Sequence, residues 1–409
     1  MYSSSLQLCS SVKTMPMTLI PISFFLFFFF FWQACNHYGH ILSRIQNILQ
    51  APGCSIQTLL TERAQANKRL VRALGLSNTF VSDEQDVHTT FVAHAQRLLN
   101  TTKKNGWAHF QSTARHAVRW NISKSESELN SDNLVCNPPS ANIDSDTFEF
   151  DRAIRNITLY VVLQGVLQID DVESSSYEDI DVVATSITKL WALSKKPEPI
   201  PPHLLADLNA RLRRLVPDED VFPAPLDFVV PTWETLWRVV ATTVAYSHGS
   251  SKIQEAFQAF NTHPRDDTYR KIGEDGGVSV KSVVAEALRL NPPSKRIARA
   301  KAPWWCPSFF AAWVSRVVVK ADVEALLCCD IWGPDVGSFR PARHDNADEK
   351  REAMALVFGH GTLRCIAASW APMAAAVIAG VVLDEYEVLP GKDIGEREGW
   401  EGWQLKSSM

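Results

Sequence analysis

Residues 358–365, near the end of the chain, read FGHGTLRC and carry its strongest chemical signal. They lead into an apolar, alanine-rich segment over residues 366–383, which we expect to form a helix. Gly359 and Gly361 allow the backbone to turn tightly and to approach a bulky group. Backbone amides at a helix N-terminus favour thiolate over thiol, so Cys365 is a candidate nucleophile, redox thiol or metal ligand.

The neighbours of Cys365 favour the metal-ligand interpretation, with haem as the metal site. Phe358 offers a ring that can pack on a flat group. Arg364 offers a cation for carboxylates or for the thiolate. The alternative interpretation is a buried structural cysteine in a glycine turn.

A second motif lies upstream, where residues 286–299 read EALRLNPPSKRIAR. Glu286 and Arg289 are three positions apart and share one face of a helix, which Pro292 and Pro293 must end. Taken alone, such a pair is usually solvated and contributes roughly a few tenths of a kcal/mol.

A third motif lies between the other two, where residues 330–343 read DIWGPDVGSFRPAR and end at Arg343. A second arginine would allow Glu286 to pair with two guanidinium groups. Such a buried cluster would hold the segment before the cysteine loop against the Glu286 helix.

Together, ExxR, WGPDxxxFRPxR and FGxGxxxC resemble the cytochrome P450 superfamily of haem-thiolate monooxygenases, most specifically over Asp227–Leu383. The resemblance implies a mainly α fold with a small β component. It implies haem b as cofactor, Cys365 as the proximal iron ligand, and a structural triad of Glu286, Arg289 and Arg343. The motif variants are similar to those of filamentous fungi, where such enzymes often serve secondary metabolism.

The resemblance also bears on the haem contacts. It implies that Phe358 and Gly361 lie against the haem. The family usually has Arg or His two residues before the cysteine to pair with a haem propionate, whereas this chain has Leu363 there and Arg364 one position later. Either Arg364 takes this role or another cation does.

Other candidate propionate partners lie elsewhere in the chain. Arg296 and Arg299 follow the Glu286 helix. His88 is a further candidate, although such a histidine is more often on the surface.

The oxygen-activating helix is expected over residues 225–240, which read PLDFVVPTWETLWRVV. The family usually has an acid followed by a threonine there, so Glu234 is expected to supply protons and Thr235 to serve the oxygen side. Pro231 has no N–H and would leave the carbonyl of Asp227 unpaired within the helix. The alternative is an ordinary helix with an apolar face.

The N-terminal region contains an uncharged apolar run over residues 17–35, close to the roughly 20 residues of a membrane span. We expect a tail over residues 1–16, a single-pass signal anchor over residues 17–35, and a haem domain over residues 36–409 on the cytosolic face of the endoplasmic reticulum. A cleaved signal peptide is the alternative, because Lys13 precedes the run.

Length, charge and cysteine content limit the size of the core, the binding partners and the compartment that can be expected. The 409 residues suffice for a large core, and the net charge of −4 gives no reason to expect nucleic-acid binding. The eight cysteines show no CxxC spacing, which favours a reducing compartment with free thiols.

Patterns outside the motifs predict further elements. Residues 36–75 read as helical up to Gly75, residues 123–146 as a polar loop, and residues 148–169 as an apolar helix. The first sheet strands that the family normally places near the N-terminus are not recognisable.

The expected function is insertion of one oxygen atom of O2 into a hydrophobic small molecule, with electrons from an NADPH-cytochrome reductase. One alternative is a haem-binding relic that has lost oxygen chemistry. Another is a haem-thiolate isomerase or dehydratase, which would need Cys365 but neither a reductase nor Thr235.

Overall fold

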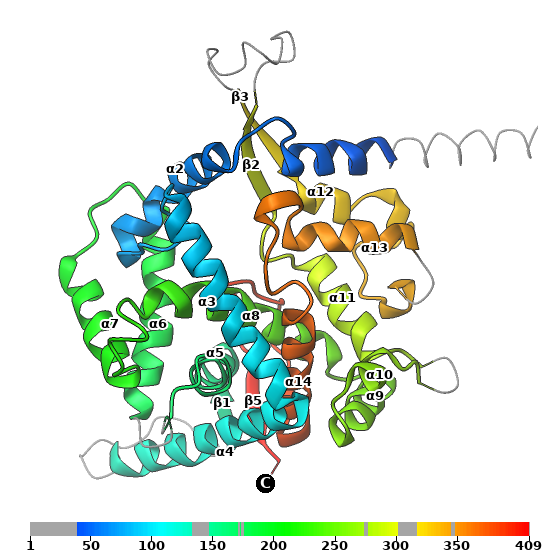
Figure 1. The fold of residues 1–409 in the computed structure, drawn as a ribbon. Coiled ribbons are helices and arrows are strands. Elements are labelled where there is room, and N and C mark those ends of the chain that lie inside the picture. The colour runs from blue at the N-terminus through cyan, green and yellow to red at the C-terminus, as the bar shows by residue number, and fades with distance from the viewer. Residues whose placement is uncertain are drawn as a thin grey trace, which may run out of the picture.

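The computed structural model describes residues 39–132, 147–170, 172, 176–273, 277–301, 317–344 and 348–408. Within these ranges the fold is mainly helical with two small sheets, as the resemblance implies (Figure 1). One helix spans residues 39–50. The longer labelled helices are α2 (Ile56–Leu74), α3 (Gln85–Asn105), α4 (Trp107–Asp132), α5 (Phe150–Val161), α6 (Tyr177–Ser194), α7 (Pro202–Leu215), α8 (Leu226–Ser247), α9 (Ser251–Thr262), α11 (Val280–Leu290) and α14 (Ala371–Glu385).

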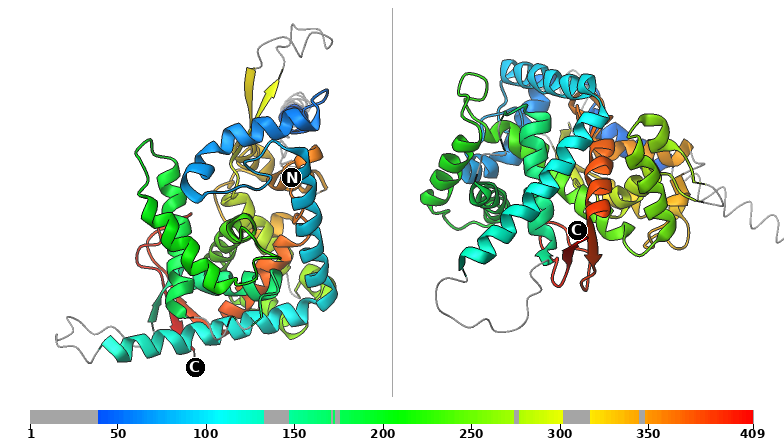
Figure 2. Two further views of the ribbon diagram at one scale, coloured as in Figure 1. Left: turned by 60° about the vertical axis from the view of Figure 1, so that its left-hand side comes forward. Right: turned by 90° about the horizontal axis from the view of Figure 1, so that it is seen from below.

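The shorter helices lie mostly between α9 and the cysteine loop: α10 (Asp266–Arg270), α12 (Val323–Leu327) and α13 (Asp348–Ala355). The strands are β1 (Thr147–Glu149), β2 (Arg296–Lys301), β3 (Val317–Asp322), β4 (Tyr386–Leu389) and β5 (Gln404–Ser407). One antiparallel sheet has the order β1-β5-β4, and the other pairs β2 with β3. The two sheets lie at opposite ends of the molecule (Figures 1 and 2).

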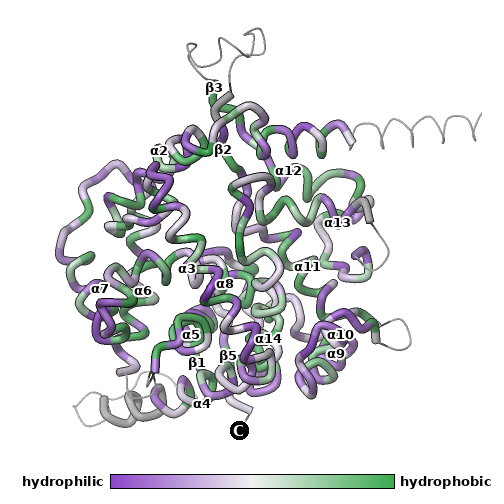
Figure 3. The backbone as a smooth tube through the Cα atoms, in the orientation of Figure 1, coloured by the Kyte–Doolittle hydropathy of each residue, from purple (hydrophilic) through white to green (hydrophobic). Residues whose placement is uncertain are grey.

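The core forms where α8 packs against α5 and against α14. Figure 3 shows the hydrophobic α5 inside the molecule, whereas α9 and α10 at the periphery carry hydrophilic stretches. α14 is buried from Met373 to Val382, because Ala, Val and Ile side chains occupy every face of this segment.

α8 runs near the middle of the molecule and is buried along almost its whole length (Figure 1). Pro231 lies inside it and cannot donate the helical hydrogen bond to the carbonyl of Asp227, so another group must donate to that carbonyl. The Nδ2 of Asn78 donates to that carbonyl at 2.8 Å. The helix therefore continues through the proline with its backbone acceptor satisfied by a distant loop.

Several boundaries differ from the sequence expectations. α14 begins at Ala371 rather than at residue 366, because Pro372 suits the first turn of a helix and residues 366–370 form turns before it. α4 continues to Asp132, so the first part of the expected loop over residues 123–146 is helical.

One further expectation agrees with the structure, and another agrees only in part. α2 ends at Gly75, whose φ of 61° is left-handed. The apolar segment expected to be one helix begins as β1, continues as α5 and passes into the π-helical turn Val162–Val166. The described residues before Thr147 contain no strand.

In the described part of the chain, no helix combines the length and hydrophobicity needed to span a bilayer. The anchor expected over residues 17–35 lies outside the described residues and stays a prediction.

Candidate active site

The cysteine loop is closed by its own backbone. The amide of Cys365 donates to the carbonyl of Phe358 at 2.8 Å, and the amide of Arg364 donates to the carbonyl of Gly361 at 3.1 Å. Gly359 and Gly361 have φ values of 75° and 70°, which side chains disfavour. These two glycines allow the loop to present the cysteine at its end.

Gly361 is required for a second reason. A Cβ atom at this position would lie 3.1 Å from the Cα of Gln50, at the end of the helix over residues 39–50. The loop therefore sits directly against the N-terminal helix.

The Cys365 side chain is reached by solvent, while Phe358 is half-buried and Arg364 is exposed. Surrounding protein atoms desolvate the thiol and raise its pKa, against the opposing effects of the Ala367 amide and the Arg364 charge. The expected stabilisation of the thiolate by a helix N-terminus is not present, because α14 starts only at Ala371. A bound metal ion would instead supply the charge that removes this proton.

Glu286 lies on α11 and is fully buried among cations. Its carboxylate accepts from Arg289 at 2.8 and 2.9 Å and from Arg343 at 2.8 Å. The structure thus brings together the three residues that the motifs single out. Two further groups bind the carboxylate: the Nε2 of His344 lies 2.8 Å from it, and the backbone amide of Arg340 donates to it at 3.0 Å. Neither was expected from the sequence.

These partners determine the charge of Glu286. Burial alone would raise its pKa, but hydrogen bonds from His344, Arg289 and the Arg340 amide outweigh burial and lower the pKa to about 2. Glu286 is therefore an anion at neutral pH, with its oxygen atoms engaged.

Arg343 uses its remaining donors to hold the segment that precedes it. It donates to the carbonyls of Trp332, Asp335 and Ser338. The Glu286 cluster therefore fixes the whole WGPDxxxFRPxR segment against α11.

A second group of cations lies where α2 packs against β2. Arg299 on β2 is buried, and Arg63 on α2 is half-buried. Burial lowers the pKa of Arg63 to about 10, with a further contribution from Arg299. The Nε atoms of both arginines are buried, with no hydrogen-bond partner in the described part of the chain. Two neighbouring cations, each with an unused buried donor, favour the binding of an anionic group here.

His88 belongs to the same group. Its Nδ1 lies 2.7 Å from the Thr79 hydroxyl and 3.5 Å from Arg63. Burial lowers its pKa, and the Arg63 charge lowers it further. His88 is therefore neutral at neutral pH and positions Thr79 and Arg63 rather than adding a charge.

The loop that carries Thr79 is attached to α8. The carboxylate of Asp227 accepts from the amides of Ser77 at 2.9 Å and Asn78 at 3.1 Å and from the Ser77 hydroxyl at 2.5 Å. The start of α8 thereby sets the position of the cationic group.

The other candidate cations are placed differently. Arg296 pairs with Asp322 at 3.0 Å and is exposed. Arg364 is also exposed, on the cysteine loop. Of the candidates from the sequence, Arg299 is the one that the structure buries with unused donors, and Arg63 is the partner that sequence reasoning missed.

Glu234 and Thr235 point to different surroundings on α8. Glu234 is buried and accepts from the Nε of Arg397 at 2.6 Å, whereas Thr235 is exposed on an otherwise buried helix. Burial raises the pKa of Glu234, although Arg397 and Arg238 act in the opposite direction. Arg397 was not expected from the sequence, because it lies 163 residues away without a recognisable motif.

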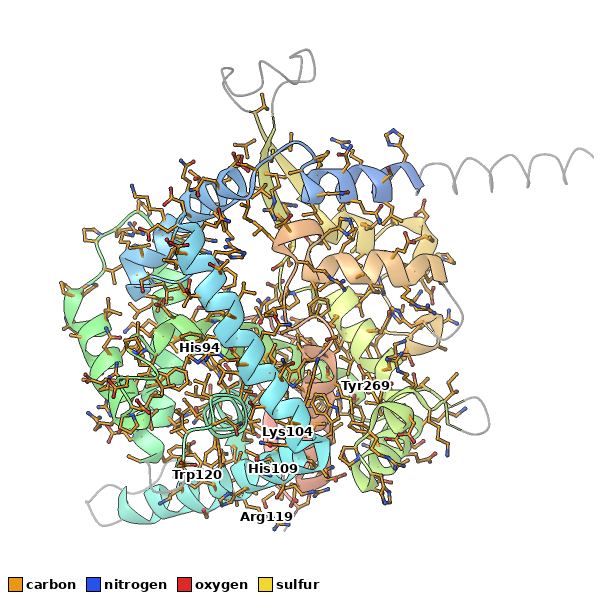
Figure 4. The ribbon with its side chains drawn as sticks, viewed as in Figure 1. His94, Lys104, His109, Arg119, Trp120 and Tyr269 are labelled. Atoms are coloured by element: carbon orange, nitrogen blue, oxygen red, sulfur yellow. The ribbon has the colours of Figure 1, made fainter. Side chains whose placement is uncertain are left out.

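Three half-buried residues, Phe228, Pro231 and Thr232, lie on α8 at helical spacing before Thr235. Phe228 stacks on Phe91 of α3 at 5.3 Å between ring centroids, and its ring lies tilted against that of His94 at 4.5 Å. His94 also lies on α3 (Figure 4). This face of α8 is the least buried along the helix and carries two apolar residues and two threonines.

A separate cavity of about 760 Å³ lies between α6, β1 and residues 397–404. Neither Cys365 nor Thr235 lines it. We therefore do not assign it to the active site.

No protein-family model matches the chain, and neither does any curated protein. Among solved structures, the crystal structure of a cytochrome P450 (CYP102L1) is similar, with a TM-score of 0.54 over 82% of this chain and 85% of that chain. The chain has the cytochrome P450 fold. At 15% sequence identity, the similarity establishes the fold and not the activity.

The residues present fit a haem group. No cluster of three or more His, Cys, Asp or Glu side chains in the described residues could hold a metal ion by itself. Haem carries its own nitrogen ligands for the iron, so a single protein thiolate such as that of Cys365 suffices to hold it. The unused donors of Arg63 and Arg299 match the need for cations that pair with haem propionates.

Proposed function

We propose that the chain is a haem-thiolate monooxygenase that inserts one oxygen atom of O2 into a hydrophobic small molecule. The observation that carries the proposal is the combination, within a P450 fold, of a solvent-reached Cys365 at the end of a glycine loop with the half-buried Arg63 and the buried Arg299, whose Nε donors have no partner in the described residues. One group with an iron atom and two carboxylates would satisfy both sites.

Each residue then has a defined task. Haem b, when bound, supplies oxygen activation. Cys365 would supply the thiolate that binds the iron. Arg63 and Arg299 would pair with the propionates, and the Glu286 cluster keeps the segment before the cysteine loop in place.

Glu234 and Thr235 would deliver protons to the place where oxygen binds. The Thr235 hydroxyl is exposed and free to orient a water molecule beside the substrate. Burial raises the pKa of Glu234 above its ordinary value, which suits a group that takes up and releases a proton. Its ion pair with Arg397 would have to loosen for the carboxylate to reach that water.

The partners follow from the same proposal. Electrons would come from an NADPH-cytochrome reductase, and residues 17–35 would anchor the chain in the endoplasmic reticulum membrane with the haem domain in the cytosol. The similarity of its motifs to those of filamentous fungi supports a role in secondary metabolism.

The deciding experiment is the absorption spectrum of the reduced, carbonyl-bound protein. We expect the red-shifted Soret band of thiolate ligation, and Cys365→Ser should abolish it because a neutral hydroxyl is a poor donor to iron. Cys328→Ser is the matched control, since Cys328 is also an exposed free cysteine. An unchanged band in Cys365→Ser would refute the assignment.

A further inference from the structure

Two adjacent cysteines join α12 to the WGPDxxxFRPxR segment. Cys328 directly follows α12 and is exposed, and Cys329 comes next and is half-buried. Both are free thiols. The haem site proposed above uses neither of them.

The backbone bends where the two cysteines meet. Cys328 has φ −108° and ψ 7°, and Cys329 has φ −81° and ψ 167°. A residue near the helical region followed by an extended one resembles the centre of a type VIII turn. The chain is therefore already turned sharply at the point where a ring through two neighbouring sulfur atoms would have to close.

A disulfide between neighbouring residues is strained. The peptide bond between Cys328 and Cys329 is trans, so their Cα atoms are about 3.8 Å apart. Most disulfides have Cα atoms roughly 4.4–6.8 Å apart, and a bridge outside this range is more easily reduced. This pair therefore suits a bond that forms and is reduced again, as expected of a cysteine pair in a reducing compartment.

The surroundings give the two thiols different reactivities. Cys328 is exposed and can meet a dissolved oxidant. Burial raises the pKa of Cys329, and the Asp330 charge raises it too, against the opposing effect of the Ile331 amide. Cys329 is therefore the less reactive of the two and suits the second step, in which a thiol resolves an oxidised neighbour.

The Cys329 thiol also makes a structural contact. Its Sγ donates to the carbonyl of Leu326 at 3.0 Å, and the Nε1 of Trp332 donates to the same carbonyl at 3.0 Å. A disulfide removes the proton on this sulfur atom and with it the first of the two hydrogen bonds.

The same turn contacts the Glu286 cluster. The carbonyl of Leu327 accepts from Arg289 at 2.8 Å, and the carbonyl of Trp332 accepts from Arg343. The guanidinium carbon of Arg289 also lies 5.3 Å from the centroid of the Trp332 ring. A change in this turn therefore reaches both arginines that pair with Glu286.

We propose that Cys328 and Cys329 are a site of reversible oxidation, where hydrogen peroxide converts the two thiols into a disulfide that loosens the segment ending at Arg343. The inference goes beyond the proposed function and does not depend on it. It follows from the adjacency of the thiols, the bend between them and their contacts with the Glu286 cluster.

The reaction has two steps. The Cys328 sulfur attacks one oxygen atom of peroxide, the O–O bond breaks, the other oxygen leaves as water, and a sulfenic acid remains. The Cys329 sulfur then attacks the oxidised sulfur, the S–S bond forms, and the sulfenic oxygen leaves as water with the thiol proton. The two sulfur atoms give up the two electrons that reduce the peroxide. An external thiol such as glutathione reverses the reaction by disulfide exchange.

Mass spectrometry tests whether the disulfide forms. The full chain with haem is treated with hydrogen peroxide, the remaining thiols are alkylated, and the peptide that contains both cysteines is analysed. We expect it to weigh two hydrogen atoms less and to carry no alkyl group, and we expect dithiothreitol to restore both thiols. Cys54 is the internal control, because it is a half-buried free cysteine without a neighbouring cysteine and should stay alkylated. A sulfinic acid at Cys328 with an alkylated Cys329 would overturn the proposal.

Urea unfolding tests the effect on the fold. Peroxide should lower the urea midpoint of the parent by roughly 0.2–0.5 M, the shift expected for one lost hydrogen bond, and dithiothreitol should reverse this shift. Cys329→Ser should keep the midpoint of the reduced parent, because its hydroxyl can still donate to the Leu326 carbonyl, and should not respond to peroxide. Cys328→Ser should not respond either, whereas Cys54→Ser should respond like the parent.

Two results of the unfolding experiment would contradict the proposal. An equal response to peroxide in the parent, Cys328→Ser and Cys329→Ser would place the oxidised group elsewhere. A disulfide that forms without any shift of the midpoint would refute the link to the segment that ends at Arg343.

Discussion

Two glutamates in this protein are buried to nearly the same extent, yet their surroundings differ. Glu286 on α11 accepts from two arginines, a histidine and a backbone amide, and its pKa falls to about 2. Among the described residues, Glu234 on α8 has one direct partner, Arg397, and burial raises its pKa. The comparison teaches that burial alone does not assign a role. Glu286, whose oxygens are fully hydrogen-bonded, suits a structural task, whereas Glu234, with fewer donors around it, suits proton transfer.

The largest expected effect comes from removing the fully hydrogen-bonded carboxylate of Glu286. Glu286→Ala leaves the Arg289 and Arg343 guanidinium groups buried without their anion, which costs about 3–5 kcal/mol. We expect aggregated protein or apoprotein, measured as haem content and as the free energy of unfolding in urea. Glu352→Ala, at an exposed position on α13, is the control. Normal haem content in Glu286→Ala would remove the structural role.

The two glutamates should also respond to pH in opposite directions. The folded-state pKa of Glu286 is depressed to about 2 from 4.5, so its stabilising contribution is present above about pH 4.5 and is lost as the pH falls toward 2. The difference of roughly 2.5 pKa units corresponds to about 3 kcal/mol. Glu234 has a raised folded-state pKa, so its ionisation destabilises the fold as the pH rises above its unfolded value.

Urea unfolding at pH 6 and pH 4 measures these slopes. The free energy of unfolding of the parent exceeds that of Glu286→Gln, and this difference should be smaller at pH 4 than at pH 6. Relative to Glu234→Gln, the free energy of unfolding of the parent should be higher at pH 4 than at pH 6. If the stability difference between parent and variant changed with pH in the same direction for both variants, the contrast between the two glutamates would be contradicted.

A smaller effect is expected at the propionate site. Arg299→Gln should weaken haem retention by about tenfold, because it removes a buried charged donor, whereas Arg364→Gln should change it little because Arg364 is exposed. The measurement is transfer of haem to an apo acceptor protein. If Arg364→Gln has the larger effect, the cysteine loop and not β2 supplies the propionate partner.

The smallest structural change with a functional consequence is expected at Thr235. Thr235→Ala should retain haem and substrate, since the residue is exposed, but should form less product per NADPH consumed because a proton no longer arrives in time. Thr232→Ala, one turn earlier, is the control. If Thr235→Ala couples as well as the parent, a reductase-independent reaction becomes the better explanation.

The sequence was informative where function depends on residues close together in the chain. The mainly α fold with a small β component was predicted correctly, and Glu286 and Arg289 share a helix face three positions apart. The cysteine loop was recognisable from its two glycines. Its electrostatics were predicted wrongly, because the helix was expected to start at residue 366 and starts at Ala371.

The rest could not be predicted, because its partners come together only in three dimensions. Arg63 meets Arg299 through the packing of α2 on β2, and Arg397 reaches Glu234 from the C-terminal loop. No spacing rule connects positions so far apart. A single arginine in a helical pattern reads as a surface residue until the fold buries it.

The bonds between Asp227 and the loop at Ser77 and Asn78 have a consequence for synthesis. They join residues 150 positions apart, so on the ribosome α2 emerges long before its acceptor on α8. At about 5–20 residues per second, the interval is roughly 8 to 30 s. During that time Ser77 and Asn78 lack the carboxylate that holds them, and the neighbouring Leu74 and Leu76, buried in the finished protein, have not reached their final packing. A chaperone that holds the nascent N-terminal third would therefore raise the yield of this protein more than one that acts after release.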